Sequence, residues 1–212
     1  RNDFDHTLEL DLSKWQHFID AAKINSKDSI KIANKANTMS HRDLMLKIPP
    51  RKISMKEIKE KVKNDTNTPF QLSIKRGDKI DLNHEEKDKI ALIRGFGMVV
   101  DYYRPSASSI SSSLPYFGVA KVGKMLGSSD ANVISETFFK DLEPALHDRW
   151  DSKTQGLDTK YNKVKRVVDE FYEKLDENLL EILGEDEVES DNQEWINQGF
   201  DIPKYPEKYL RR

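Results

Sequence analysis

The sequence contains no cysteine and no long apolar run. The absence of cysteine excludes disulfide bonds, zinc–thiolate sites and thiol catalysis. No segment approaches the ~18 consecutive apolar residues that a membrane-spanning helix needs, so we expect no transmembrane segment. Apolar residues are scarce as well, at 36% of the chain against 34% charged, whereas an ordinary globular domain is about half apolar and about a quarter charged. This deficit predicts an elongated helical protein, or one that buries surface against partners.

Charge is nearly balanced overall but unevenly placed. The net charge is −2, which does not favour nucleic-acid binding, because that function usually comes with a strongly basic surface. Residues 23–63 carry twelve Lys/Arg and four Asp/Glu, whereas residues 169–194 carry twelve Asp/Glu and one basic residue, Lys174. Two interpretations stay open: two solvated faces, or electrostatic docking to partners of complementary charge.

Apolar spacing predicts an all-α, elongated protein. Residues recur at helical intervals over 13–37, 54–62, from 83 to about 100, 130–150 and 158–183, the last with coiled-coil-like spacing. Pro49 and Pro50 forbid helix between the first two segments and predict a rigid elbow. The Ser/Gly-rich stretch 105–129 predicts a long loop, with Pro144 breaking the next helix and Gly184 ending the longest one.

We therefore divide the chain into four parts. Residues 1–99 form an N-terminal helical region with the Pro-Pro elbow, and residues 100–156 a Ser/Gly-rich insertion followed by a helix. Residues 157–184 form the long coiled-coil-like helix. Residues 185–212 form an acidic linker and an extended aromatic tail.

The sequence offers little for catalysis or cofactor binding. Residues 118–124 have the G-x-x-x-x-G-K spacing of a phosphate loop, but the next residue is Met125 where a Ser or Thr hydroxyl must hold magnesium. No two of the five histidines are spaced to share a metal on one helix face, and no serine lies in G-x-S-x-G. We expect no catalytic residue, no cofactor and no metal, with nucleotide binding at 118–124 as a less favoured alternative.

Short motifs in a fixed order resemble subunit d of the mitochondrial F-type ATP synthase. They are Trp15-x-x-Phe18, Leu46-x-Ile48-Pro49-Pro50-x-x-Ile53, Lys59-x-x-Val62 and the tail Asp201-Ile202-Pro203-x-Tyr205-x-Glu207-Lys208-Tyr209. The resemblance covers roughly residues 7–95 and 158–209. Residues 100–156 have no counterpart and would be an insertion, which surface connections tolerate best.

The resemblance implies a non-catalytic stator subunit of the peripheral stalk. Such a subunit lies on the matrix side of the mitochondrial inner membrane and holds the catalytic head against rotor torque during proton-driven ATP synthesis. The implied partners are subunit b, the oligomycin-sensitivity-conferring subunit, the catalytic-head subunits and the membrane sector, without nucleic acid.

On this reading, apolar side chains pack against partner subunits. The residues expected to do so are Trp15, Phe18, Ile19, Pro49, Pro50, Val164, Val168, Phe171, Leu175, Trp195, Tyr205 and Tyr209. The alternative from a different class is a free-standing helical protein-binding module outside the mitochondrion.

Overall fold

The computed structural model describes residues 15–24, 38–52, 65–106 and 114–197, with side chains described as far as residue 183. Its elements are α-helices, β-strands and short 3₁₀ helices labelled η. They are α1 (Gln16–Lys23), β1 (Met39–Ile48), β2 (Thr66–Arg76), η3 (Ile80–Asn83), β3 (Lys89–Arg94), β4 (Met98–Tyr103), β5 (Tyr116–Val122), η5 (Gly123–Leu126), α2 (Asp130–Asp141), α3 (Leu157–Lys160) and α4 (Val164–Asn197). None of the helices in these ranges is long and apolar enough to cross a membrane.

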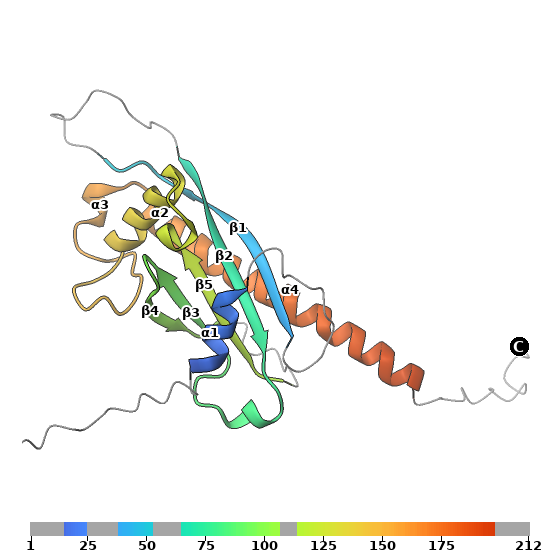
Figure 1. Ribbon diagram of the computed structural model, residues 1–212. Helices are drawn as coiled ribbons and strands as arrows, with labels where there is room; N and C mark the ends of the chain where they lie inside the picture. The colour runs from blue at the N-terminus through green and yellow to red at the C-terminus, as the bar shows by residue number, and fades with distance from the viewer. Residues whose placement is uncertain (1–14, 25–37, 53–64, 107–113, 198–212) are drawn as a thin grey trace, which may run out of the picture.

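The centre of the fold is a five-stranded mixed sheet in the order β1-β2-β5-β3-β4. All neighbouring strands are antiparallel except β3 and β5, which run parallel. Figure 1 shows α4 running along one face of the sheet and α1 lying on the other. The molecule therefore has layers of helix, sheet and helix, and each face of the sheet has its own apolar core.

The larger core lies between the sheet and helices α2 and α4. Leu72 from β2, Leu92 from β3 and Phe171 from α4 are almost completely buried in it. Burying a side chain of this size contributes about 1.5–3 kcal/mol. Every second residue of β1 and β2 points to this face, since side chains alternate along a strand. This core fixes the long helix to the sheet and makes α4 part of the domain.

The expected all-α fold class is wrong, because the described residues contain this sheet. The helix expected from residue 83 to about 100 is the hairpin of β3 and β4. Gly95 and Gly97, which join the two strands, have φ values of +63° and +103°, a backbone region that glycine adopts without strain. The run Ile90–Ile93 is buried on both faces of the sheet, which gives a continuous apolar stretch rather than alternation.

Two segments outside the expected helices are strands as well. β2 lies between the helices expected at 54–62 and from residue 83, and β5 lies within the expected loop 105–129. Gly118 is in the middle of β5, where a Cβ atom would stand 2.7 Å from Cγ1 of Ile90 and 2.9 Å from Cδ1 of Ile74. A glycine that had suggested a loop is therefore required by close packing in the centre of the sheet.

The prediction of a Pro-Pro elbow between two N-terminal helices is also wrong. Pro49 and Pro50 follow strand β1, not a helix. The first helix spans Gln16–Lys23 and ends at Ile24, which has an extended backbone. The rest of its expected range, together with the expected helix at 54–62, lies outside the described residues.

Two of the expected helices are present with other bounds: α2 covers Asp130–Asp141 of the expected 130–150, and α4 begins at Val164 where residue 158 was expected. Helix α2 begins after the N-cap Ser129, whose side chain accepts the backbone N–H of Asn132, and ends before Pro144. Helix α4 contains the apolar stripe expected over 158–183 and continues through Gly184, which was expected to end it. The stripe packs on the sheet of its own chain.

Candidate functional site

The residues expected to pack against partners mostly pack inside this chain. Val164, Val168, Phe171 and Leu175 belong to the large core beneath α4. Phe18 is buried beneath α1, Trp15 stacks on Tyr102 at a centroid distance of 5.2 Å, and Ile19 and Pro50 are partly buried while Pro49 is buried. The side chain of Trp195 and all of Tyr205 and Tyr209 lie outside the described part of the chain. The described members of this set therefore stabilise the fold itself.

The 118–124 segment does not form a phosphate loop. Its first glycine is in the middle of β5, and only Gly123 and Lys124 reach the turn that follows the strand. The backbone N–H of Lys124 donates to Oε2 of Glu136 at 3.1 Å, and the N–H of Gly95 donates to the same oxygen at 3.0 Å. A carboxylate of the chain thus already occupies the N–H of Lys124, an amide of this segment that a bound anion would use.

One histidine has the contacts of a serine–histidine–aspartate chain. Nδ1 of His41 lies 3.0 Å from Oγ of Ser73, and its Nε2 lies 3.3 Å from Oδ1 of Asp43. In a nucleophilic site the serine is accessible and the aspartate is buried. Here Ser73 is completely buried, whereas the Asp43 side chain is 60% exposed. A substrate would need to reach the serine. We therefore assign these contacts to the pairing of β1 with β2.

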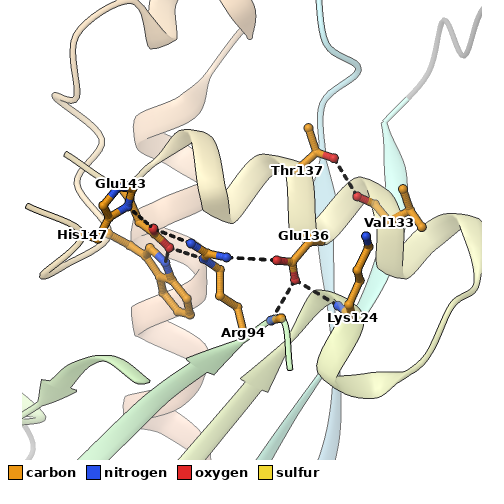
Figure 2. A network of polar contacts seen from close by, with 9 residues as sticks. Arg94, Lys124, Val133, Glu136, Thr137, Glu143 and His147 are labelled. Carbon is orange, nitrogen blue, oxygen red and sulfur yellow. Dashed lines mark hydrogen bonds and ion pairs between the residues drawn. The ribbon is translucent and has the colours of Figure 1, made fainter. Parts of the chain in front are cut away.

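The most developed polar network joins the β3–β4 hairpin to α2 and the loop after it (Figure 2). Nη2 of Arg94 donates to Oε2 of Glu143 at 2.6 Å, and its Nε donates to the other carboxylate oxygen. Nη1 of Arg94 donates to Glu136 at 3.1 Å. The Glu143 side chain is fully buried. Burial alone would raise the pKa of Glu143, but its bonds to Arg94 and His147 outweigh this effect and lower the pKa.

This network holds two surface loops in place. His147 Nδ1 lies 2.7 Å from Oε2 of Glu143, which fixes the loop that follows α2. The Glu136 carboxylate holds Gly95, which begins the hairpin turn. The sequence did not single out Arg94, Glu136 or Glu143. The available signal was a charged residue at the end of an apolar strand, followed at once by Gly95-Phe96-Gly97.

The turn that this network holds presents a phenylalanine to solvent. Phe96 is 97% exposed, between the two glycines with positive φ. Nearby on the same hairpin, Met98 is 40% exposed and Val99 is 38% exposed, and in the loop held by Glu143, Leu146 is 82% exposed. The hairpin and this loop are joined by the bonds of Arg94 and His147 to Glu143, and we call their four exposed apolar residues the tip patch. A rigid backbone that displays apolar side chains to solvent is suited to binding.

Comparison with known proteins gives no relative: no protein-family model, no curated protein and no solved structure matches this chain. The resemblance to the stalk subunit implied an all-helical architecture, but the described residues contain a five-stranded sheet. The stator role and the mitochondrial location thus stay predictions that no observation on this chain tests.

Proposed function

We propose that this protein is a non-catalytic binding module that docks on a partner protein through the tip patch of Phe96, Met98, Val99 and Leu146. One observation carries the proposal: Phe96 is 97% exposed on a turn that is held in place by hydrogen bonds. Exposing a phenylalanine to water forgoes about 1.5–3 kcal/mol relative to burial. A fixed turn cannot recover this by folding the ring inward, so a partner is the means of burying it.

The network beneath the turn supports this role through pre-organisation. A flexible loop would lose conformational freedom on binding, whereas a turn already fixed by Arg94 and Glu136 loses little. Glu143 contacts both Arg94 and His147, so the Phe96 turn and the Leu146 loop are held by the same carboxylate. Interfaces draw most of their binding energy from a few such apolar anchors.

The charges near the tip patch favour a protein over an anionic membrane. Asp148 and Arg149 follow Leu146 in the same loop, and Asp101 follows Val99 on the hairpin. Asp101 interacts electrostatically with both Asp148 and Arg149. A surface that binds acidic lipids has clustered basic residues without carboxylates among them. Interspersed charges of both signs around apolar anchors are the usual surroundings of a protein interface.

The test replaces Phe96 in the full chain. A tagged wild-type chain, a Phe96→Ser variant and an Ile80→Ser variant are each purified from the source cells, and the co-purifying proteins are quantified by mass spectrometry. Ile80 is the matched control because it is 86% exposed but lies in η3, in the connection between β2 and β3. We expect at least one protein to be retained by wild type and Ile80→Ser and to fall about tenfold or more with Phe96→Ser.

Two results would contradict the proposal. One is a set of co-purifying proteins that is the same for all three chains. The other is equal loss with both variants, which would point to non-specific adhesion of exposed apolar residues. Melting temperatures measured in parallel separate binding from folding. Because the Phe96 side chain already faces water, we expect Phe96→Ser to change the free energy of unfolding by less than about 0.5 kcal/mol.

A further inference from the structure

Two polar side chains on the buried face of α2 have an oxygen without a hydrogen-bond partner. Asn132 is 5% exposed and Ser135 is 1% exposed. Neither Oδ1 of Asn132 nor Oγ of Ser135 bonds to any residue that the structure describes. Nearly all buried polar groups in folded proteins are paired, with protein or with ordered water, because an unpaired group keeps the full cost of its desolvation. These two oxygens therefore need a partner.

Both side chains forgo the local partner that their type commonly uses. Asn132 is at the third position of α2 after the N-cap Ser129, from which the Glu or Gln of a capping box accepts the N–H of the cap residue. A serine within a helix can donate to the carbonyl four residues before it, as the Thr137 hydroxyl does to Val133 at 2.9 Å (Figure 2). Asn132 and Ser135 make neither bond, and both oxygens stay on the buried side of the helix.

The two oxygens lie close enough to share one small molecule. Residues three apart are neighbours on a helix surface, with Cβ atoms about 5–6 Å apart. A water that bonds two oxygens at about 2.8 Å each spans up to about 5.5 Å between them. Nδ2 of Asn132 lies beside Gly127, where an added Cβ would stand 3.5 Å from it. The loop before α2 thus closes one side of this region, and β2 and η5 pack against the helix.

We propose that α2 has a binding site for one ordered water molecule, which bridges Oδ1 of Asn132 and Oγ of Ser135. The water donates to the amide oxygen and bonds the hydroxyl, and buried waters use about two to four such partners. An anion does not suit the site, because Oδ1 is an acceptor. A metal ion does not suit it either, because the described residues contain no group of three or more acidic or histidine side chains that could hold one. This site is independent of the tip patch.

A high-resolution crystal structure of the full chain tests the bridge directly. We expect an ordered oxygen at about 2.7–3.2 Å from both Oδ1 of Asn132 and Oγ of Ser135. A direct hydrogen bond between the two side chains would overturn the proposal. So would a bond from the Ser135 hydroxyl to the carbonyl of Ala131, or two oxygens that both remain unpaired.

Ser135→Ala tests the same site in solution. If the hydroxyl binds a water, its removal leaves that water and Asn132 short of a partner, whereas removal of an unpaired hydroxyl relieves the cost of burying it. Thr137→Ala is the matched control, because it brings a similar gain in helix propensity on the same helix and its hydroxyl bonds locally. We expect Ser135→Ala to melt about 2–4 °C below Thr137→Ala. An equal or higher melting temperature would count against the water.

The double variant Asn132→Ala/Ser135→Ala separates a shared water from two independent sites. Because one water serves both residues, the double variant should lose less stability than the two single variants together. Oxygen-17 relaxation of the solvent counts internal waters that exchange slowly, and we expect this count to fall by one in the double variant and to stay unchanged in Thr137→Ala. Additive losses would overturn the bridge, and an unchanged water count in the double variant would overturn the water itself.

Discussion

Arg94 and Glu143 form a bidentate ion pair between the end of β3 and the residue that follows the C-cap of α2. Burial in itself lowers the pKa of a guanidinium, but the hydrogen bonds to Glu143 are the larger effect and raise the pKa of Arg94. The indole N–H of Trp150 points to the same carboxylate at 3.4 Å. The pair therefore connects the hairpin, α2 and the following loop through one buried acid.

Glu143→Ala should destabilise the protein strongly. The substitution leaves the Arg94 guanidinium buried with only Glu136 beside it, and breaking one side of a buried ion pair typically costs about 3–5 kcal/mol. The free energy of unfolding from urea denaturation measures this. Arg149→Ala is the control, since Arg149 is 59% exposed and lies 3.7 Å from Asp151, and an exposed pair contributes about 0–1 kcal/mol. Similar losses in the two variants would show that the Arg94–Glu143 pair is no more important than a surface pair.

Asp141 should make the protein more stable above about pH 4 than below it. Burial would raise the pKa of Asp141, but hydrogen bonds from Lys160 and Tyr161 outweigh it and lower the pKa. A carboxyl whose pKa is lower in the folded state stabilises the fold above its unfolded pKa, about 3.9, and this contribution is lost as the pH falls through the folded value.

The check compares wild type with Asp141→Asn. The variant should be less stable at pH 6, and the difference in melting temperature should shrink as the pH is lowered from 5 to 2. A difference that stays constant over this range would mean that the ionised carboxylate is not what stabilises the contact with Lys160 and Tyr161.

The pKa of Asp101 is shifted in the opposite direction, upward. Burial is the main cause that raises its pKa, with Asp148 adding to it, so at neutral pH the ionised side chain disfavours the folded state. Asp101→Asn removes the charge and keeps an oxygen that can accept the N–H of Tyr102, which Oδ1 of Asp101 accepts at 2.7 Å. We expect a rise in stability of less than about 1 kcal/mol at pH 7. The gain should vanish below about pH 4, where the aspartate of the wild type is itself neutral; a loss of stability at pH 7 would contradict this.

Helices α2 and α4 could be predicted from sequence because each packs one side on the core and turns the other to water, which produces the 3.6-residue period. The sheet was missed because its central strands are apolar on both faces. Ile90–Ile93 and the residues around Gly118 are unbroken apolar runs, and such runs are ambiguous from periodicity alone, so Ile90 and Ile93 also fit the spacing of a helix. Gly95 and Gly97 fall within the expected helix and Gly118 within the expected loop, whereas the first two form a hairpin turn and the third allows close packing.

The candidate site was harder still to foresee. Arg94 and Glu143 are 49 residues apart, and only the parallel pairing of β3 with β5, followed by α2, brings them together. In a chain with 34% charged residues, one arginine and one glutamate are not distinguishable from those on solvated faces. The exposure of Phe96 could not be predicted either, because an apolar residue between two glycines is compatible with a buried helix and with a hairpin turn.

Gly118→Ala should be costly although it adds only one methyl group. The new Cβ would stand 2.7 Å from Cγ1 of Ile90 and 2.9 Å from Cδ1 of Ile74, and β5 is paired on both sides, so the strand cannot move away. Overpacking of a tight core costs about 1–3 kcal/mol, which urea denaturation would measure. Ile74→Val removes the Cδ1 atom, so in the Gly118→Ala background it should cost less than in the wild type, where it merely leaves a small cavity. If the two substitutions instead add without any such coupling, Cδ1 of Ile74 is not the obstacle, and the requirement for glycine at position 118 must come from Ile90 alone.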